Sequence, residues 1–306
     1  MKGTVLEVDP RVRSALDAGE PIVALESTIV AHGMPFPQNL ETARNLEAIV
    51  RARGATPATI AVLDGQIRIG LDDASLERLA RATNVRKLSR ADLAYAVARG
   101  ENGATTVAAT MYCAHLAGIA VFATGGIGGV HRGAETTFDV SADLYELART
   151  DVTVVCAGAK ALLDVPKTLE LLETLGVPVL CFQSDEFPAF WSRSSGLAAP
   201  LRVDGVPEIA AVVAARRALN VSGGVLVANP VPADAEIPSA EMEPLIAQAL
   251  ADARDAGIVG KRVTPFLLGR ILTLSDGRSL RTNVALAEAN ARLAAELARA
   301  LCEGRA

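Results

Sequence analysis

The sequence predicts an α/β fold with three layers, α/β/α, around a mixed and largely parallel central sheet. The main observation is that short apolar runs typical of buried strands alternate with helical patterns along most of the 306 residues. A second observation is the segment TIAVLDGQIRIG, which reads as a hairpin turning at Asp64-Gly65 and so adds an antiparallel pair. No repeat or low-complexity linker divides the chain, and we expect a single domain over residues 1–306.

The expected elements follow from apolar periodicity, with glycines closing several helices. Strands are expected at 22–28, 59–63, 66–70, 119–126, 152–158, 177–182 and 223–230, and helices at 41–54, 88–100, 105–118, 141–150, 161–176, 238–257 and 280–302. The stretch 185–207, rich in Pro, Ser and Phe, is the one long irregular segment. Loops of this length are usually functional or interfacial, so we expect a lid or a subunit contact there.

Composition narrows the classes of protein. With 50% apolar residues the chain can bury a large core, and a net charge of −5 without a basic run argues against nucleic-acid binding. No apolar stretch reaches the length of a membrane span, and carboxylates near the N-terminus do not suit a signal peptide, so we expect a cytoplasmic protein. The four widely spaced cysteines are expected to be free, buried thiols.

Lys160 is the first candidate for chemistry. It follows the apolar run 152–156 through Gly158 and Ala159, which places it at the carboxyl end of a buried strand. Ligands of open α/β sheets bind at that end of the strands, and desolvation there favours a neutral, nucleophilic amine. This segment alone does not separate a nucleophile from a lysine that extends out of a loop into water.

Glu26 directly follows another apolar run, 22–25, and we expect it to be partly buried near a strand end. A carboxylic acid in that position can donate a proton at neutral pH. A paired structural carboxylate is the alternative. For the neighbouring His32 we favour a structural role, such as capping a turn.

The glycine-rich turn ATGGIGGVHRGAE at 123–135 follows a third strand. Its glycines allow backbone N–H groups to approach a ligand, and Thr124, His131 and Arg132 nearby favour an anion. The turn matches neither the dinucleotide-binding fingerprint nor a Walker loop.

Asp139 and Asp143 stand four residues apart, with Ser141 between them, near the start of a helix. That spacing can place both carboxylates on one face for a hard divalent ion such as Mg²⁺ or Mn²⁺. The alternative, which we favour for a generic pattern of this kind, is that Asp139 or Ser141 caps the helix. Lys87 and Asn283, taken alone, indicate no more than a surface lysine and a capping residue.

Together these segments resemble the pseudouridine-5′-phosphate glycosidase family, also called indigoidine-synthase-A-like. The resemblance runs from about residue 20 to the last helix. The matching stretches are ALESTIVAHGMPFPQNLETA, TPATIAVLDGQIRIGL, KLSRADL, GATTVAATMYCAHLAGI, VFATGGIGGVHRGAETTFDVSADL, VVCAGAKALLDVPKTLE, GKRVTPFLL and SLRTN.

The resemblance implies reversible cleavage of pseudouridine 5′-phosphate to uracil and ribose 5-phosphate, with a divalent metal such as Mn²⁺, by a homotrimer. Lys160 matches the nucleophile, Glu26 the proton donor and Asp139 the metal ligand. Asn283 matches a residue associated with the base. The other positions that match or adjoin the substrate site are Lys87, Val107, Thr124, His131, Ser141, Ala142 and Asp143.

Two rival functions remain open. A Schiff-base aldolase or lyase acting on another sugar phosphate would share Lys160 and differ in binding no nucleobase. A ligand-sensing accessory protein would keep the pocket without turnover, which the intact set of Lys160, Glu26 and Asp139 disfavours.

Overall fold

The computed structural model describes residues 5–304; residues 1–4 and 305–306 of the expected 1–306 domain lie outside this range. The strands are β1 Leu6–Val8, β2 Ile22–Leu25, β3 Thr56–Leu63, β4 Gln66–Ile69, β5 Arg86–Leu88, β6 Gly103–Thr105, β7 Val121–Ala123, β8 Thr153–Cys156, β9 Val179–Phe182, β10 Leu201–Val203 and β11 Val225–Ala228. The α-helices are α1 Pro10–Asp17, α2 Thr28–Ala31, α3 Gln38–Ala52, α4 Asp73–Arg81, α5 Arg90–Arg99, α6 Val107–Leu116, α7 Ala134–Thr137, α8 Ala142–Arg149, α9 Val165–Thr174, α10 Val206–Ala218, α11 Ser239–Asp255, α12 Val263–Leu274 and α13 Arg278–Glu303. Two short 3₁₀ helices are η1 Ala233–Ala235 and η2 Gly260–Arg262.

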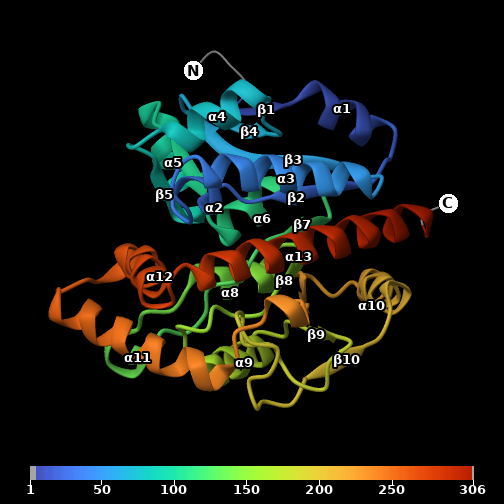
Figure 1. Ribbon diagram of the computed structural model, residues 1–306. Coiled ribbons are helices and arrows are strands. Elements are labelled where there is room, and N and C mark those ends of the chain that lie inside the picture. Colours follow the sequence, from blue (N-terminus) through green and yellow to red (C-terminus); the bar gives the residue numbers. More distant parts are fainter. Residues whose placement is uncertain (1–4, 305–306) are drawn as a thin grey trace.

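The strands form one mixed, largely parallel sheet, as expected (Figure 1). Its order is β1-β4-β3-β2-β7-β8-β11-β9-β10, while β6 pairs with both β3 and β5. Antiparallel pairing occurs between β3 and β4 and between β3 and β6. The hairpin expected at Asp64-Gly65 is confirmed: both residues have positive φ, 51° and 73°, as a tight two-residue turn requires.

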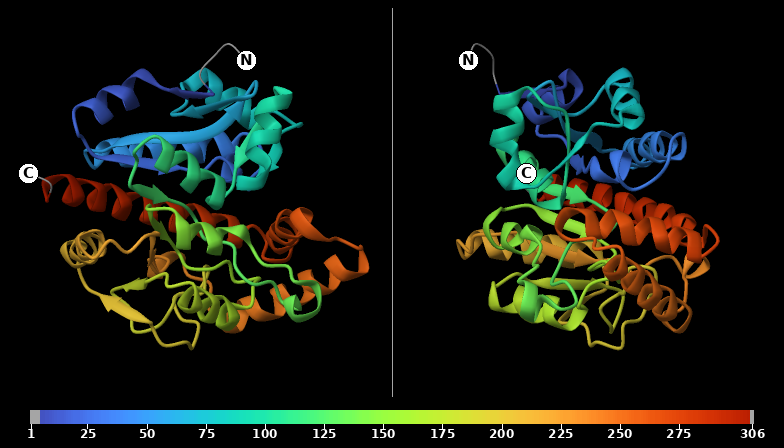
Figure 2. Two further views of the ribbon diagram at one scale, coloured as in Figure 1. Left: turned by 180° about the vertical axis from the view of Figure 1, so that it is seen from behind. Right: turned by 90° about the vertical axis from the view of Figure 1, so that its left-hand side faces the viewer.

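Helices cover both faces of the sheet, which confirms the three-layer fold. The long helix α13 crosses the middle strands β2, β7 and β8 on one face, flanked by α3 and α10 (Figure 1). The view from behind in Figure 2 shows the other face, where α6 packs on β2, β3 and β7 and contacts α8. The apolar face of α13 carries Leu286, Leu293, Leu297 and Leu301, all buried at helical spacing against the sheet.

Several expected elements differ in extent, and β1, β5, β6, β10, α1, α4, α10 and α12 were not expected from the sequence. The strand expected at 22–28 ends at Leu25, and α2 begins at Thr28. The helix expected at 105–118 begins only at Val107, because Thr105 belongs to β6 and the Thr106 side chain caps the helix. The helix expected at 161–176 begins at Val165, with Asp164 as its cap, so Lys160 lies in an extended turn. The segment 185–207 is not irregular throughout, since it contains β10 and the start of α10.

The cysteines behave as expected. All four are free thiols, of which Cys113, Cys156 and Cys181 are buried. Burial raises the pKa of each of these three thiols to about 12, so they are inert packing groups near neutral pH. Over residues 5–304, no helix is both long and apolar enough to cross a membrane.

Candidate functional site

Three neighbouring parallel strands deliver the central side chains of the site. In the sheet, β2 lies beside β7 and β7 beside β8, with Leu25 opposite Ala123 and Ala123 opposite Val155. The chain leaves these strands at Glu26, at Thr124 and in the turn that leads to Lys160. Carboxyl ends of parallel strands share one edge of the sheet, and for this reason residues far apart in sequence meet there.

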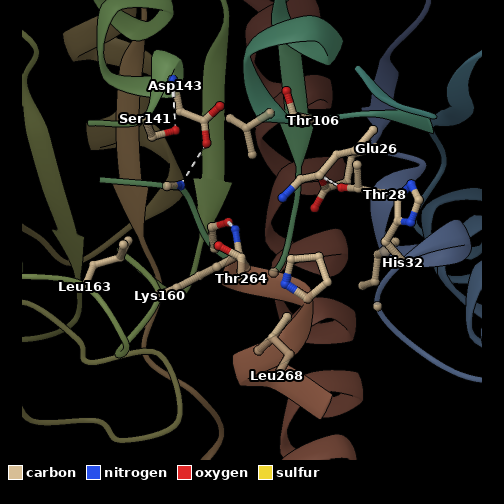
Figure 3. Close-up of a pocket in the computed structure, with 18 of the residues that line it drawn as sticks. Glu26, Thr28, His32, Thr106, Ser141, Asp143, Lys160, Leu163, Thr264 and Leu268 are labelled. Carbon is tan, nitrogen blue, oxygen red and sulfur yellow. Dashed lines mark hydrogen bonds between the residues drawn. The ribbon is translucent and has the colours of Figure 1, made fainter. Parts of the chain in front are cut away.

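Lys160 projects from the turn after β8 into a cavity at this edge (Figure 3). Its backbone N–H donates to Ile127 O at 3.1 Å, and its Nζ donates to Gly126 O at 2.5 Å. The turn needs glycine at position 158, where φ is 85° and a Cβ would lie 2.6 Å from Pro188 O. The amine is thus half-buried and held at the cavity wall.

Glu26 enters the same cavity from the opposite side (Figure 3). The residue is only 8% exposed, and both carboxylate oxygens accept hydrogen bonds from threonines. Thr124 Oγ1 donates to Oε1 at 2.6 Å, and Thr28 Oγ1 donates to Oε2 at 2.5 Å. The two bonds fix the direction of a carboxyl group that faces the lysine across the cavity.

The alternative favoured for Asp139 and Ser141 is confirmed: Ser141 caps α8, and its side chain accepts from Asp143 N. Asp139 precedes α8, whose cap is Ser141, so the two carboxylates do not share a helix surface. Asp143 is 6% exposed and accepts from Ala108 N at 2.9 Å through Oδ1 and from Gly128 N at 2.8 Å through Oδ2 (Figure 3). Its oxygens join the start of α6 to the glycine-rich turn, and the residue also lines the cavity.

The glycine-rich turn contributes Gly125, Gly126 and Gly128 to the cavity lining. The N–H groups of Ile127, Gly128 and Val130 donate to protein acceptors and are not directed at a ligand. Its glycines allow close packing instead: a Cβ on Gly126 would lie 2.7 Å from the Phe190 ring. A Cβ on Gly128 would lie 2.3 Å from Ser141 Oγ.

The cavity has a volume of about 370 Å³, in the range of small-molecule sites. Of the residues predicted for the site, Glu26, Lys87, Val107, His131, Asp139, Ser141, Ala142, Asp143, Lys160 and Asn283 all line it. Thr124 does not line it but contacts it through Glu26. A second cavity of about 240 Å³ adjoins it and shares His32, Pro265, Leu268 and Asn283 as walls.

Two histidines lie in this region. Burial lowers the pKa of His131, an effect that Asp139 opposes and that Lys87 and Lys160 reinforce. Burial, followed by the charge of Lys87, also lowers the pKa of His32. The backbone of His32 ends α2, the turn role expected for it, and its side chain lines the cavity as well. Its buried Nε2 has no hydrogen-bond partner within residues 5–304.

The residues here fit a metal that keeps most of its water. No group of three or more His, Cys, Asp or Glu side chains among the described residues is placed to hold an ion. Asp139 nevertheless presents a carboxylate to the cavity beside His131, whose lowered pKa keeps the imidazole neutral. Mg²⁺ and Mn²⁺ are commonly held by one or two such side chains together with water and substrate phosphate.

Several residues of the cavity were not predicted from the sequence. Thr28 holds Glu26, and the 183–200 segment supplies Phe190. Helix α12 supplies Thr264, Pro265 and Leu268. The irregular segment with its aromatic residues was the only sequence signal for Phe190. The apolar pattern of α12 does not distinguish it from a helix of the core.

Comparison with known proteins shows the family of this chain. The family model described as "Indigoidine synthase A like protein" matches residues 11–300. A pseudouridine-5′-phosphate glycosidase of Methylobacterium nodulans is 65% identical over 98% of this chain and 89% of its own length. One of Solibacter usitatus is 64% identical over 96% of this chain and 98% of its own.

Two solved structures share the fold at nearly full length. The prealnumycin C-glycosynthase AlnA, solved in complex with ribulose 5-phosphate, superimposes with a TM-score of 0.91 at 39% identity and 99% coverage of both chains. An indigoidine synthase A-like protein of Thermotoga maritima gives a TM-score of 0.89 at 36% identity, again with 99% coverage of both. The chain therefore belongs to the indigoidine-synthase-A-like family, together with the pseudouridine-5′-phosphate glycosidases that it resembles.

Proposed function

We propose that this protein reversibly cleaves pseudouridine 5′-phosphate into uracil and ribose 5-phosphate. The observation that carries the proposal is the placement of the Lys160 amine and the Glu26 carboxyl group on opposite walls of one cavity. Relatives 58–65% identical to this chain carry the name of that activity, which supports the assignment of substrate.

The bond to be broken joins two carbons, which explains the need for a lysine. A carbon leaving group is a poor site for the simple protonation that ordinary N-glycosidases use. In the proposed mechanism, Glu26 donates a proton to the ring oxygen as the C1′–O4′ bond breaks and the ribose opens. The neutral Lys160 amine then adds to C1′ and passes a proton back to the Glu26 carboxylate, which is thereby ready to donate to C5. The C1′–C5 bond then breaks with its electron pair moving to uracil C5, which takes up a proton, leaving a Schiff base between Lys160 and C1′. Water hydrolyses this Schiff base to ribose 5-phosphate and the free amine.

Glu26 is the proposed proton carrier at both the ring oxygen and C5. Its two threonine partners direct the carboxyl group into the cavity, so proton transfer needs no side-chain search. Lys160, held at Gly126 O, is similarly positioned before substrate enters.

We place the 5′-phosphate near Lys87 on β5 and the first residues of α6 and α8. Val107, Ser141 and Ala142 at these helix starts line the cavity, and helix N-termini favour negative charge. The N–H groups at 127, 128 and 130 of the glycine-rich turn donate to protein acceptors, so any contribution of this turn to the phosphate would come from Gly125 and Gly126, which line the cavity.

Asp139, with His131 beside it, would hold a divalent ion such as Mn²⁺. When bound, such an ion supplies positive charge that orients and neutralises a phosphate. Asn283 at the far wall is the proposed contact to the base. A homotrimeric assembly and a cytoplasmic location complete the proposal.

A second candidate is a Schiff-base lyase that acts on another sugar phosphate. The likeness to AlnA, whose structure contains ribulose 5-phosphate, favours a sugar phosphate in this cavity without naming the second substrate.

The deciding experiment incubates purified protein with pseudouridine 5′-phosphate and Mn²⁺ and follows uracil by chromatography, with unphosphorylated pseudouridine in parallel. We expect uracil from the phosphate only. Borohydride should trap ribose 5-phosphate on wild-type protein and on Lys167→Ala, an exposed-lysine control, but not on Lys160→Ala. Trapping without any uracil release would favour the lyase, and substantial turnover by Lys160→Ala would refute the covalent role.

A further inference from the structure

The only tryptophan of the chain is hydrogen-bonded to the predicted base-contacting residue. Trp191 Nε1 donates to Asn283 Oδ1 at 2.7 Å, and Trp191 is 1% exposed. An indole N–H is only a donor, so the atom of the carboxamide that faces it must be the oxygen. The chemistry of the contact thus settles an orientation that amide geometry alone leaves ambiguous.

The amino group of the Asn283 carboxamide is available to a ligand in the cavity. Asn283 lines both adjoining cavities, and among residues 5–304 no acceptor is hydrogen-bonded to its Nδ2. A ring that binds here therefore meets two N–H donors, which pair with a carbonyl oxygen and clash with an amino group.

Both partners are held by the same short segment. Ile237 N donates to Trp191 O at 3.0 Å, and Thr282 Oγ1 donates to Ala235 O at 2.8 Å. The spacing between the indole and the carboxamide is thus set by backbone anchors at 235–237. These anchors hold the backbone on both sides of the Trp191–Asn283 hydrogen bond.

Backbone strain points to the same turn. Phe190 has a φ of 63°, in the left-handed region that a bulky residue rarely adopts, and it is 4% exposed. Its ring lines the cavity and lies 5.0 Å from the Trp191 ring in an edge-on arrangement. Such strain persists where the surrounding structure enforces it, often at binding sites. Here it places the Phe190 ring in the cavity wall and the Trp191 ring directly behind that wall.

We propose that Trp191 is a positioning residue that fixes the Asn283 carboxamide so that its amino group reads a carbonyl oxygen of the nucleobase. This inference rests on the proposed function. It adds a determinant of base selection that lies outside the cavity lining, since Trp191 is not itself in the lining and its hydrogen bond is to Asn283.

The test uses the synthetic direction, uracil plus ribose 5-phosphate, with KM measured for each substrate. Trp191→Phe removes the N–H and should raise KM for uracil about tenfold, the loss of one oriented polar contact, while KM for ribose 5-phosphate changes less than about twofold. Phe182→Leu is the control, since it shortens an aromatic residue at the end of β9, and it should keep the wild-type KM for uracil. An unchanged uracil KM in Trp191→Phe, or a parallel rise in both KM values, would overturn the inference.

A second variant covers the case in which Trp191→Phe does not fold. Asn283→Asp keeps the indole and replaces the amino group by an acceptor oxygen. We expect uracil to perturb the fluorescence of Trp191 in the wild type and to lose this effect in Asn283→Asp, while ribose 5-phosphate is still trapped by borohydride. Equal uracil responses in the two proteins would refute the inference. Failure of the proposed function is recognised separately, because wild-type protein would then neither trap ribose 5-phosphate nor make product.

Discussion

Thr124 Oγ1 donates a hydrogen bond to Glu26 Oε1 at 2.6 Å, across 98 residues of sequence. The bond joins the ends of the neighbouring strands β7 and β2, and Asn290 of α13 in turn donates to Thr124 O at 2.8 Å. The proposed proton carrier is therefore held by a chain of contacts that reaches into the helical layer.

The first prediction concerns this bond. Thr124→Val keeps the shape of the side chain and removes the hydroxyl, so the Glu26 carboxyl group should lose its fixed direction. We expect kcat to fall about tenfold with little change in KM, because proton transfer depends on orientation. Steady-state kinetics on pseudouridine 5′-phosphate measures the effect.

The chain offers a matched control for Thr124→Val. Thr59 Oγ1 donates to Glu47 Oε1 at 2.7 Å, a buried threonine–glutamate pair outside the cavity lining. Thr59→Val should lower thermal stability and leave kcat unchanged. If both variants lower kcat alike, the effect is general loosening and the role given to Thr124 is wrong.

The second prediction separates Asp143 from Asp139. Asp143→Asn leaves either the buried N–H of Ala108 or the part-buried N–H of Gly128 without its acceptor, which should reduce the free energy of unfolding by about 1–3 kcal/mol. Asp139→Asn should change it by less than about 0.5 kcal/mol, because Asp139 is only partly buried in a loop. Urea denaturation of the two variants decides, and equal losses would mean that Asp143 has no special structural role.

The third prediction concerns the divalent ion. Removal of metal by EDTA should abolish most turnover, and Mn²⁺ should restore it. Asp139→Ala should weaken Mn²⁺ binding in calorimetry, whereas Asp185→Ala, at an exposed position, should not. Full activity after chelation, or unchanged Mn²⁺ binding in Asp139→Ala, would remove Asp139 from the metal site.

Local patterns predicted β2, β3, β4, β7, β8, β9 and β11, although several of the expected strands run past the observed ends. They did not reveal β1, β5, β6 and β10, each only three residues long. The positions of Glu26 and Lys160 near the ends of their strands were expected from the same patterns. The structural contacts of Asp143 could not be expected from the sequence, because its partners are the backbone N–H groups of Ala108 and Gly128, which carry no sequence signature. The Trp191–Asn283 bond spans 92 residues and depends on a left-handed turn at Phe190, which apolar periodicity does not reveal.

The last prediction concerns acid. Burial, with the charge of Lys87 second, lowers the pKa of His32 below the ordinary value of 6.5, so the folded protein holds this imidazole neutral. The unfolded chain binds a proton below about pH 6.5, so the stability linked to His32 is present above that pH and is lost as the pH falls.

In His32→Gln, the uptake of protons on unfolding between pH 6.5 and 5 should decrease by up to about one proton. Urea denaturation across this range measures it, and His115→Gln, at an exposed position on α6, is the control expected to keep the native slope. If the free energy of unfolding depends on pH equally in the wild type, His32→Gln and His115→Gln, the fold does not keep the His32 imidazole neutral and the prediction is wrong.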